Sequence, residues 1–292
     1  MSARTPAARP AGQAVIADRR FQHYEGHRRG DMYSFAALLW HSILWVLGFK
    51  RSARYKVVPG IVIAIAYLPS LVLIVVAEVA PPGTPLPDYA GFYQFVISAI
   101  YLFVAITAPE LICPDRRHGT LRMYMTSNLN PTLYVAAKVV AVWSVLAIVT
   151  VGPVVIELAG YSLFGHGPAG FGDWLKTLGE VLASGLVLAM FFGTVALAIA
   201  SLTDRNSFAA AGIILSFVLT GAALRILQGP LKAPDWVELV NVTGLPILMI
   251  DRIYQAPTSL NLPTWELAAA VAGWVVLGLG VLALRYRGEG RR

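Results

Sequence analysis

The sequence predicts an all-α integral membrane protein that crosses the bilayer six times. Of the 292 residues, 57% are hydrophobic and only 13% are charged, whereas soluble domains carry about 25% charged residues. Six apolar runs are each long enough to cross the hydrocarbon layer as a helix of about 20 residues. Backbone groups in lipid must be paired within their own segment, and the runs lack the alternation of barrel strands, so we expect helices.

The predicted spans lie within one transmembrane domain. The six runs cover residues 57–79, 91–112, 133–161, 175–202, 208–227 and 265–286. The predicted organisation is a cytoplasmic basic tail at 1–30, an interfacial helix and basic linker at 31–56, the six-helix transmembrane domain at 57–287 and a cytoplasmic tail at 288–292. The first of these segments lacks the apolar core of a signal peptide, so we expect it in the mature protein.

The distribution of basic residues predicts the orientation. With the N-terminus inside, all but four of the 23 Lys and Arg residues fall in cytoplasmic segments, which is the bias that sets topology. The exceptions are Lys176, Arg225, Lys232 and Arg252. The richness in Arg, Ala and Gly is typical of bacteria with a high genomic GC content. We therefore expect a multi-pass protein of the plasma (inner) membrane with both termini in the cytoplasm.

Residues 32–49 are apolar enough to span, but basic residues flank them on both sides. Because both flanks favour the cytoplasm, we expect a helix that lies in the interface, with Trp40 and Trp45 near the headgroups. A spanning helix is the alternative. A further apolar patch at 237–250 is broken by Gly244 and Pro246. It is too short to span, so we expect a re-entrant or interfacial helical pair before the last span, or a loop packed on the bundle.

The motif search excludes several kinds of chemistry. The sequence contains no phosphate-binding loop ending in Lys-Ser or Lys-Thr, no His-Glu-x-x-His and no Gly-x-Ser-x-Gly. Cys113 is the sole cysteine and the five histidines are scattered, so no metal site is expected. The basic pI of about 9.6 comes largely from membrane-flanking loops, which favours anionic lipid over nucleic acid as the partner. We expect no catalytic residue and no cofactor on this chain.

Ionisable residues within the spans do not form a relay. We expect them near the outer ends of their helices, where solvation or pairing is easy. A proton or ion relay would need carboxylates at the midplane of adjacent spans, so coupled secondary transport is disfavoured. The residues concerned are Glu78, Glu157, Glu180, Arg225 and Glu266.

The loop at 113–131 is the largest expected cytoplasmic loop and carries the most information. We expect Pro114 to end the second span, and Asp115 or Thr120 to cap a short helix that stops before Pro131. This helix would present apolar and basic side chains together at the membrane surface. It either lies on lipid or docks into the groove of a cytoplasmic partner. Glu110 and Lys138 flank the loop, where local anchoring is the simpler explanation.

The loop contains Arg117-His118-Gly119-Thr120-Leu121, followed by Pro131, Tyr134 and Lys138. Pro109-Glu110-Leu111 precedes it, and Tyr24-Glu25-Gly26-His27-Arg28 lies in the N-terminal tail. In these motifs, and in its order of spans, the chain resembles the ABC-2 type permease family. One departure lies at Ser127-Asn128-Leu129-Asn130-Pro131, where the family often has a small residue, Pro, Leu, another small residue and Arg. At this departure the chain has no basic residue to contact the partner or lipid.

The resemblance implies the membrane-spanning subunit of an ATP-driven exporter. Such a subunit pairs with a second permease, the same or a different chain, and binds two ATP-binding subunits that carry the ATP and Mg. The loop would be the coupling helix, and the second and fifth spans would line the substrate path. The implied ATPase contacts are Asp115, Arg116, Arg117, Gly119, Thr120, Leu121, Arg122 and Tyr124, with Glu110 and Lys138 as support.

Three other functions stay open at this point. A non-transporting membrane anchor or assembly factor would use the same loop to recruit soluble partners. A membrane-embedded enzyme would need convergent carboxylates, a His or a nucleophile at one depth, which the sequence does not show. A secondary transporter or channel is the remaining class. The substrate does not follow from an apolar bundle.

Overall fold

The structure is a computed structural model that describes residues 30–49, 52, 54–79, 81, 87–120, 124, 130–228, 231, 233–257, 260 and 262–289. Every regular element in these ranges is a helix. The basic tail at 1–29, most of the linker that follows α1, and the centre of the expected coupling helix at 121–123 and 125–129 lie outside the described residues. Leu121 and Arg122 are therefore not placed.

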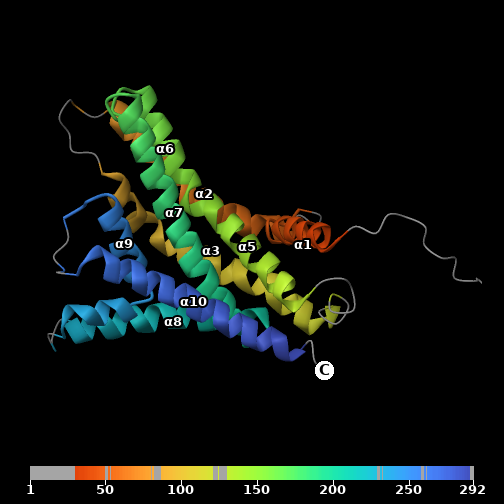
Figure 1. The fold of residues 1–292 in the computed structure, drawn as a ribbon. Helices are drawn as coiled ribbons and strands as arrows, with labels where there is room; N and C mark the ends of the chain where they lie inside the picture. Colours follow the sequence, from red (N-terminus) through yellow and green to blue (C-terminus); the bar gives the residue numbers. More distant parts are fainter. Residues whose placement is uncertain are drawn as a thin grey trace, which may run out of the picture.

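Within the described ranges, six helical segments are long and apolar enough to cross a membrane, which confirms the predicted fold class. They are α2 (Arg54–Val79), α3 (Tyr89–Arg117), α5 (Pro131–Thr150) with α6 (Gly152–Leu163), α7 (Phe171–Ala200), α8 (Asn206–Gln228) and α10 (Thr264–Glu289) (Figure 1). The third span consists of two helices because Val151 interrupts it just ahead of Pro153, whose missing N–H disfavours an uninterrupted helix.

The helix ends follow from local chemistry. Asp88 caps α3 by accepting a hydrogen bond from the Gly91 amide at 2.9 Å, which satisfies one of the free donors at a helix start. Pro131 occupies the first turn of α5, where its lack of an N–H costs nothing. The connection from α6 to α7 contains Gly165 and Gly170, both with positive φ, a conformation that glycine adopts without strain.

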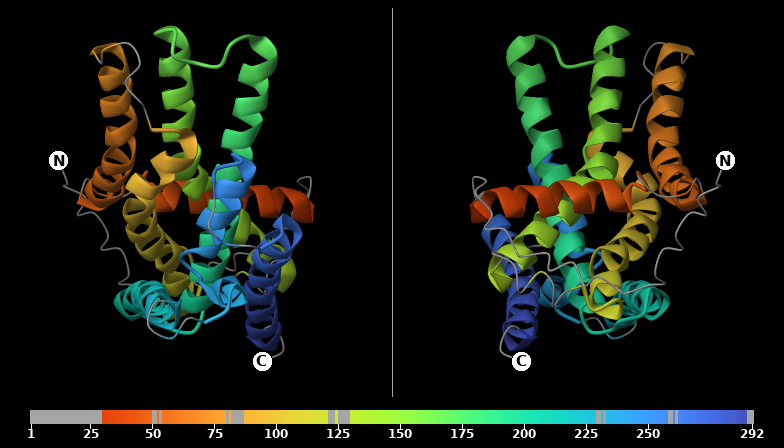
Figure 2. Two further views of the ribbon diagram at one scale, coloured as in Figure 1. Left: turned by 90° about the vertical axis from the view of Figure 1, so that its left-hand side faces the viewer. Right: turned by 90° about the vertical axis from the view of Figure 1, so that its right-hand side faces the viewer.

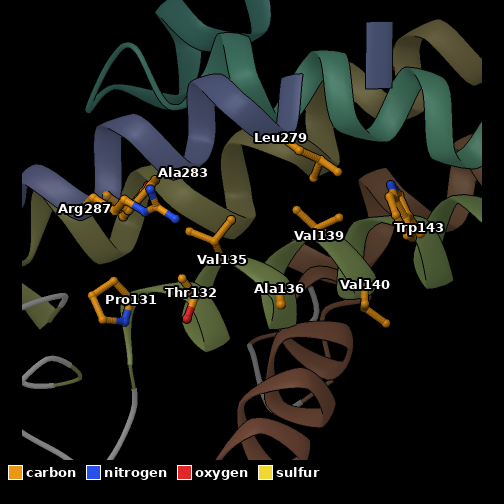
Figure 3. A pocket seen from close by; sticks show the side chains of 11 residues that line it. Pro131, Thr132, Val135, Ala136, Val139, Val140, Trp143, Leu279, Ala283 and Arg287 are labelled. Carbon is orange, nitrogen blue, oxygen red and sulfur yellow. The ribbon is translucent and has the colours of Figure 1, made fainter. Parts of the chain in front are cut away.

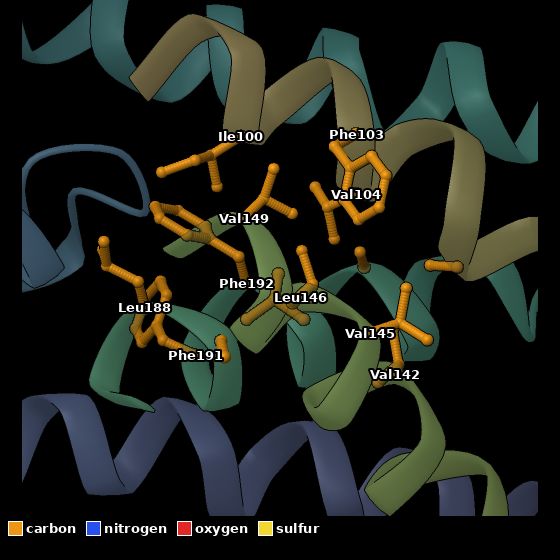
Figure 4. Close-up of a cluster of buried hydrophobic side chains, with 14 of the residues drawn as sticks. Ile100, Phe103, Val104, Val142, Val145, Leu146, Val149, Leu188, Phe191 and Phe192 are labelled. Carbon is orange, nitrogen blue, oxygen red and sulfur yellow. The ribbon is translucent and has the colours of Figure 1, made fainter. Parts of the chain in front are cut away.

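The central helices are α3, α5 and α7, which pack against one another. Figure 4 shows the side chains between them, including Phe103, Val145 and Phe192. The outer helices α2, α8 and α10 keep many large apolar side chains exposed, as expected when lipid is the solvent. Because lipid tails are as apolar as these side chains, close packing holds the helices together.

Helix α1 (Asp31–Val46) packs on α5 and touches α3. Figure 2 shows its axis at a large angle to those of α2, α6 and α7. Its 16 residues measure about 24 Å, less than the hydrocarbon thickness of about 30 Å. Trp40 is 63% exposed. This geometry suits the predicted interfacial helix.

The segment before the last span forms two short helices, as the broken apolar patch predicts. They are the 3-10 helix η1 (Asp235–Val240) and α9 (Leu245–Ile253). Both pack against α10. Glu238 accepts hydrogen bonds from Gln228 at 2.7 Å and from Asn241 at 2.5 Å, so the break between the two helices is fastened to the end of α8.

The expectation that Pro114 ends the second span is wrong. Helix α3 continues through Pro109 and Pro114 to Arg117, and the amide of His118 still donates to the carbonyl of Pro114 at 2.9 Å. Tertiary contacts of the last turn, described next, offset the hydrogen bond that a proline removes. Asp115 therefore lies inside α3 and does not cap a new helix.

Candidate functional site at the carboxyl end of α3

Asp115 connects the last turn of α3 to α5. Its Oδ2 lies 2.7 Å from Nζ of Lys138, and the hydroxyl of Tyr134 donates to the same oxygen at 2.8 Å. The Lys138 side chain is 7% exposed and that of Asp115 is 16% exposed. The ammonium also lies 5.5 Å from the centre of the Tyr134 ring, a favourable cation–π distance. Since unpaired charges are costly in such an environment, each group requires the other.

Thr120 and Tyr124 extend this arrangement beyond the helix end. The Thr120 hydroxyl donates to the backbone carbonyl of Asp115 at 3.2 Å and lies 3.3 Å from its Oδ1. The ring of Tyr124 lies 5.8 Å from that of Tyr134. Burial, together with the negative charge of Asp115, raises the pKa of Tyr124 above its ordinary value. We call Asp115, Thr120, Tyr134 and Lys138 the Asp115 network.

A second set of contacts joins the same turn to the connection between α7 and α8. Nε of Arg116 lies 3.2 Å from Oδ1 of Asp204, and its guanidinium donates to the carbonyl of Ser201. One turn and a half earlier, Glu110 accepts a hydrogen bond from Asn206 at 3.0 Å. We call Arg116, Ser201 and Asp204 the Arg116 network. The end of α3 is thus held on both sides.

The predicted contact residues divide into inward and outward groups. Asp115 and Arg116 point into the two networks, whereas Arg117 and Gly119 are exposed. Gly119 has φ of +68°, which a residue with a Cβ adopts at a cost of about 1–2 kcal/mol. Glu110 and Lys138 contact different partners, Asn206 at the start of α8 and Asp115 in the last turn of α3.

Sequence reasoning missed the contribution of two other segments. A cavity of about 180 Å³ beside Lys138 is lined by His41, Ser42 and Trp45 of α1 as well as by α3 and α5. Ser201 and Asp204 come from the short connection between the fourth and fifth spans. The polar run Thr203-Asp204-Arg205-Asn206 between two apolar runs was the available signal for that second contact.

The sequence predicts Glu157 where solvation or pairing is easy, but the structure buries it. It is 0% exposed, and neither carboxylate oxygen has a hydrogen-bond partner among the described residues. Solvent at the outer end therefore does not reach this side chain. Tyr89 and Tyr161, whose rings lie 6.0 Å apart, belong to the same region of α3 and α6.

A second, larger cavity lies between α3 and α8. Its volume is about 390 Å³, and η1 and α9 close one side. Polar side chains from α3, α8, η1 and the turn before α9 line part of it, including Gln94, Arg225, Glu238 and Asn241, together with Tyr101. The cavity therefore brings polar side chains together between the second and fifth spans.

Together these features define a polytopic α-helical membrane protein in which the last turn of α3 is fixed to the bundle on two sides. In the described part of the chain no group of His, Cys, Asp and Glu could hold a metal ion. A family model described as "ABC-2 family transporter protein" matches residues 48–222. The match covers more than half of the chain, and the chain belongs to this family. No curated protein shows significant similarity to it.

Family membership confirms the resemblance drawn from the loop motifs. The chain is a membrane permease component of an ABC transporter, and such permeases associate with ATP-binding subunits. The matched region contains α2 to α7 and most of α8, so it includes both networks at the end of α3.

Proposed function

We propose that this chain is one permease of an ATP-driven exporter in the inner membrane, with its termini in the cytoplasm. In the assembled transporter it pairs with a second permease, identical or different, and two separate ATPase subunits bind ATP and Mg. The loop at 113–131 is the docking segment for one ATPase. The observation that carries this proposal is the attachment of the last turn of α3, where the loop begins, to α5 and to the α7–α8 connection.

Transmitting a movement of the ATPase to the transmembrane helices requires a stiff connection. The Asp115 network and the Arg116 network supply one. A push on the loop moves the last turn of α3, and the Asp115–Lys138 ion pair passes that motion to α5. The Arg116 network passes it to the connection between the fourth and fifth spans at the same time. Packed helices of this kind rearrange as units because close-packed interfaces do not deform continuously.

The residues take two roles in this proposal. Arg117, Gly119, Leu121, Arg122 and Tyr124 make the ATPase interface, and Thr120 belongs both to it and to the Asp115 network. Asp115 and Arg116, with Lys138 and Glu110, link that interface to the bundle, since their side chains are already engaged within the chain. The exposed Arg117 beside the paired Arg116 illustrates the division.

The cavity between α3 and α8 fits the expected substrate path. These helices are the second and fifth spans. A path that carries polar or amphipathic molecules through lipid needs polar side chains that face protein, and Gln94, Arg225 and Asn241 meet that need. We assign this cavity to substrate passage, with the second permease on its open side.

The test is an uncoupling experiment in proteoliposomes that contain the complete transporter. Arg117→Glu together with Leu121→Glu should lower the rate of ATP-driven export at least tenfold while the chain stays inserted in the membrane. The matched control, Lys176→Glu with Leu231→Glu, places the same chemical changes on the opposite side of the bundle and should leave export within twofold of the parent. Full transport by the loop variant would contradict the docking role.

A further inference from the structure

A groove of about 340 Å³ runs between α5 and α10, next to the Asp115 network. Its wall is almost entirely apolar, with Val135, Val139 and Trp143 on one side and Leu279 on the other. Figure 3 shows these side chains together with Arg287, the charged residue of the lining. The proposed function does not use this groove.

We propose that the groove binds one acyl chain of an anionic phospholipid from the cytoplasmic leaflet, with the lipid phosphate held by Arg287. The assignment of leaflet rests on the proposed orientation. The occupant follows from three properties of the groove: its length, the position of its charge and its almost entirely apolar wall.

The length matches one leaflet. Pro131 and Trp143 lie at opposite ends of the groove (Figure 3). At 1.5 Å per residue the distance between them along α5 is about 18 Å. Half of a hydrocarbon core about 30 Å thick is about 15 Å. A single acyl chain that starts at the membrane surface therefore ends near Trp143.

The charge lies where the lipid phosphate would be. Arg287 is at the same end of the groove as Pro131 and Thr132 (Figure 3). Its guanidinium can donate to two phosphate oxygens at once. Asn130, the residue before α5, makes no side-chain cap hydrogen bond, so the positive end of that helix adds to the same field. A phosphatidylglycerol headgroup brings no cation of its own to compete with Arg287.

The groove also reaches the coupling residues. Tyr286 lines it, and the ring of Tyr286 lies 5.5 Å from that of Tyr134. The Tyr134 hydroxyl in turn donates to Asp115. A bound acyl chain contacts Tyr286 directly, so lipid occupancy restrains the side chains through which the proposed transporter is coupled. Anionic lipid then acts as a regulator of coupling.

Contact quenching of Trp143 fluorescence tests the binding site without any ATPase. The purified chain is placed in vesicles that contain a fixed fraction of brominated phosphatidylglycerol or of brominated phosphatidylcholine. The signal of Trp143 is the difference between the parent and Trp143→Phe. We expect quenching of that signal at least threefold stronger by the anionic lipid. Arg287→Gln should remove the preference, whereas Lys56→Gln, at an exposed cation near the start of α2, should keep it.

Two results would overturn the proposal. Equal quenching by both lipids would mean ordinary contact with bulk lipid, and no quenching by either would mean that protein covers the groove. Native mass spectrometry provides a second readout, since the parent should retain more phosphatidylglycerol than Arg287→Gln does. Neither readout needs transport, so a failure of the transporter proposal would leave both interpretable.

Discussion

Lys138 and Asp115 form an ion pair of 2.7 Å between α5 and the last turn of α3. The pair is almost entirely enclosed, and Tyr134 completes it by donating to the same carboxylate oxygen. An enclosed charge pair is weak evidence for stability, but it does specify a unique arrangement of the two helices. That arrangement places the exposed residues Arg117 to Gly119 at the surface.

Breaking the pair from one side should destabilise the chain strongly. Lys138→Met leaves Asp115 enclosed without its partner, and we expect a loss of about 3 kcal/mol. The double variant Asp115→Asn with Lys138→Met should recover at least half of that loss, because no charge is left unpaired. Thermal unfolding in detergent, followed by size-exclusion chromatography, measures both. A double variant less stable than either single variant would show that the pair is not the relevant interaction.

Two neighbouring arginines should behave in opposite ways. Arg116→Gln removes an ion pair to Asp204 and a charged hydrogen bond to Ser201, so we expect a stability loss of about 1–2 kcal/mol. Arg117→Gln should leave unfolding unchanged and weaken the association with the ATPase. The melting temperature of each variant and its co-purification with the ATPase distinguish a structural role from a role in the ATPase interface. If Arg117→Gln destabilised the chain instead, its placement at the surface would be wrong.

The spans could be predicted because hydropathy depends on local composition, and the break before α9 could be predicted from Gly244 and Pro246. The end of α3 could not. Pro114 is a genuine local signal for a helix end, yet the contacts of Asp115 and Arg116 with segments far along the chain override it. The polar run at 203–206 marks one of those segments, but local sequence does not specify which residue contacts which. The same limit explains Glu157, whose burial depends on packing between helices far apart in the sequence.

Two glycines of α7 provide a matched test of the central packing. A Cβ at Gly185 would lie 2.5 Å from Val151 and 3.1 Å from the backbone of Thr150. Gly185→Ala should therefore cost about 1–3 kcal/mol through overpacking. Gly179 has open space around it, so Gly179→Ala should be neutral or stabilise by up to about 1 kcal/mol through helix propensity. Equal melting temperatures for the two variants would contradict the close approach of α5 and α7.

The enclosed carboxylate of Glu157 offers a prediction on the outer half of the bundle. Both of its oxygens lack hydrogen-bond partners among the described residues, and an ionised group in that position is costly. Glu157→Gln removes the charge at nearly constant volume and should raise the melting temperature at pH 8. Glu180→Gln is the control, because Glu180 has a partner in Lys176 at 3.8 Å and should show little change. A marked fall for Glu157→Gln would indicate a partner that the charge requires.

The most direct test of the central claim is co-purification from native membranes. The tagged chain is solubilised in mild detergent and isolated, its partners are identified, and ATPase activity is measured. The account predicts a nucleotide-binding subunit at one copy per permease, with activity, and its loss from the variant Arg117→Glu with Leu121→Glu. A chain that purifies alone, without ATPase activity in any mild detergent, would contradict the proposal that loop 113–131 couples this permease to a separate ATPase.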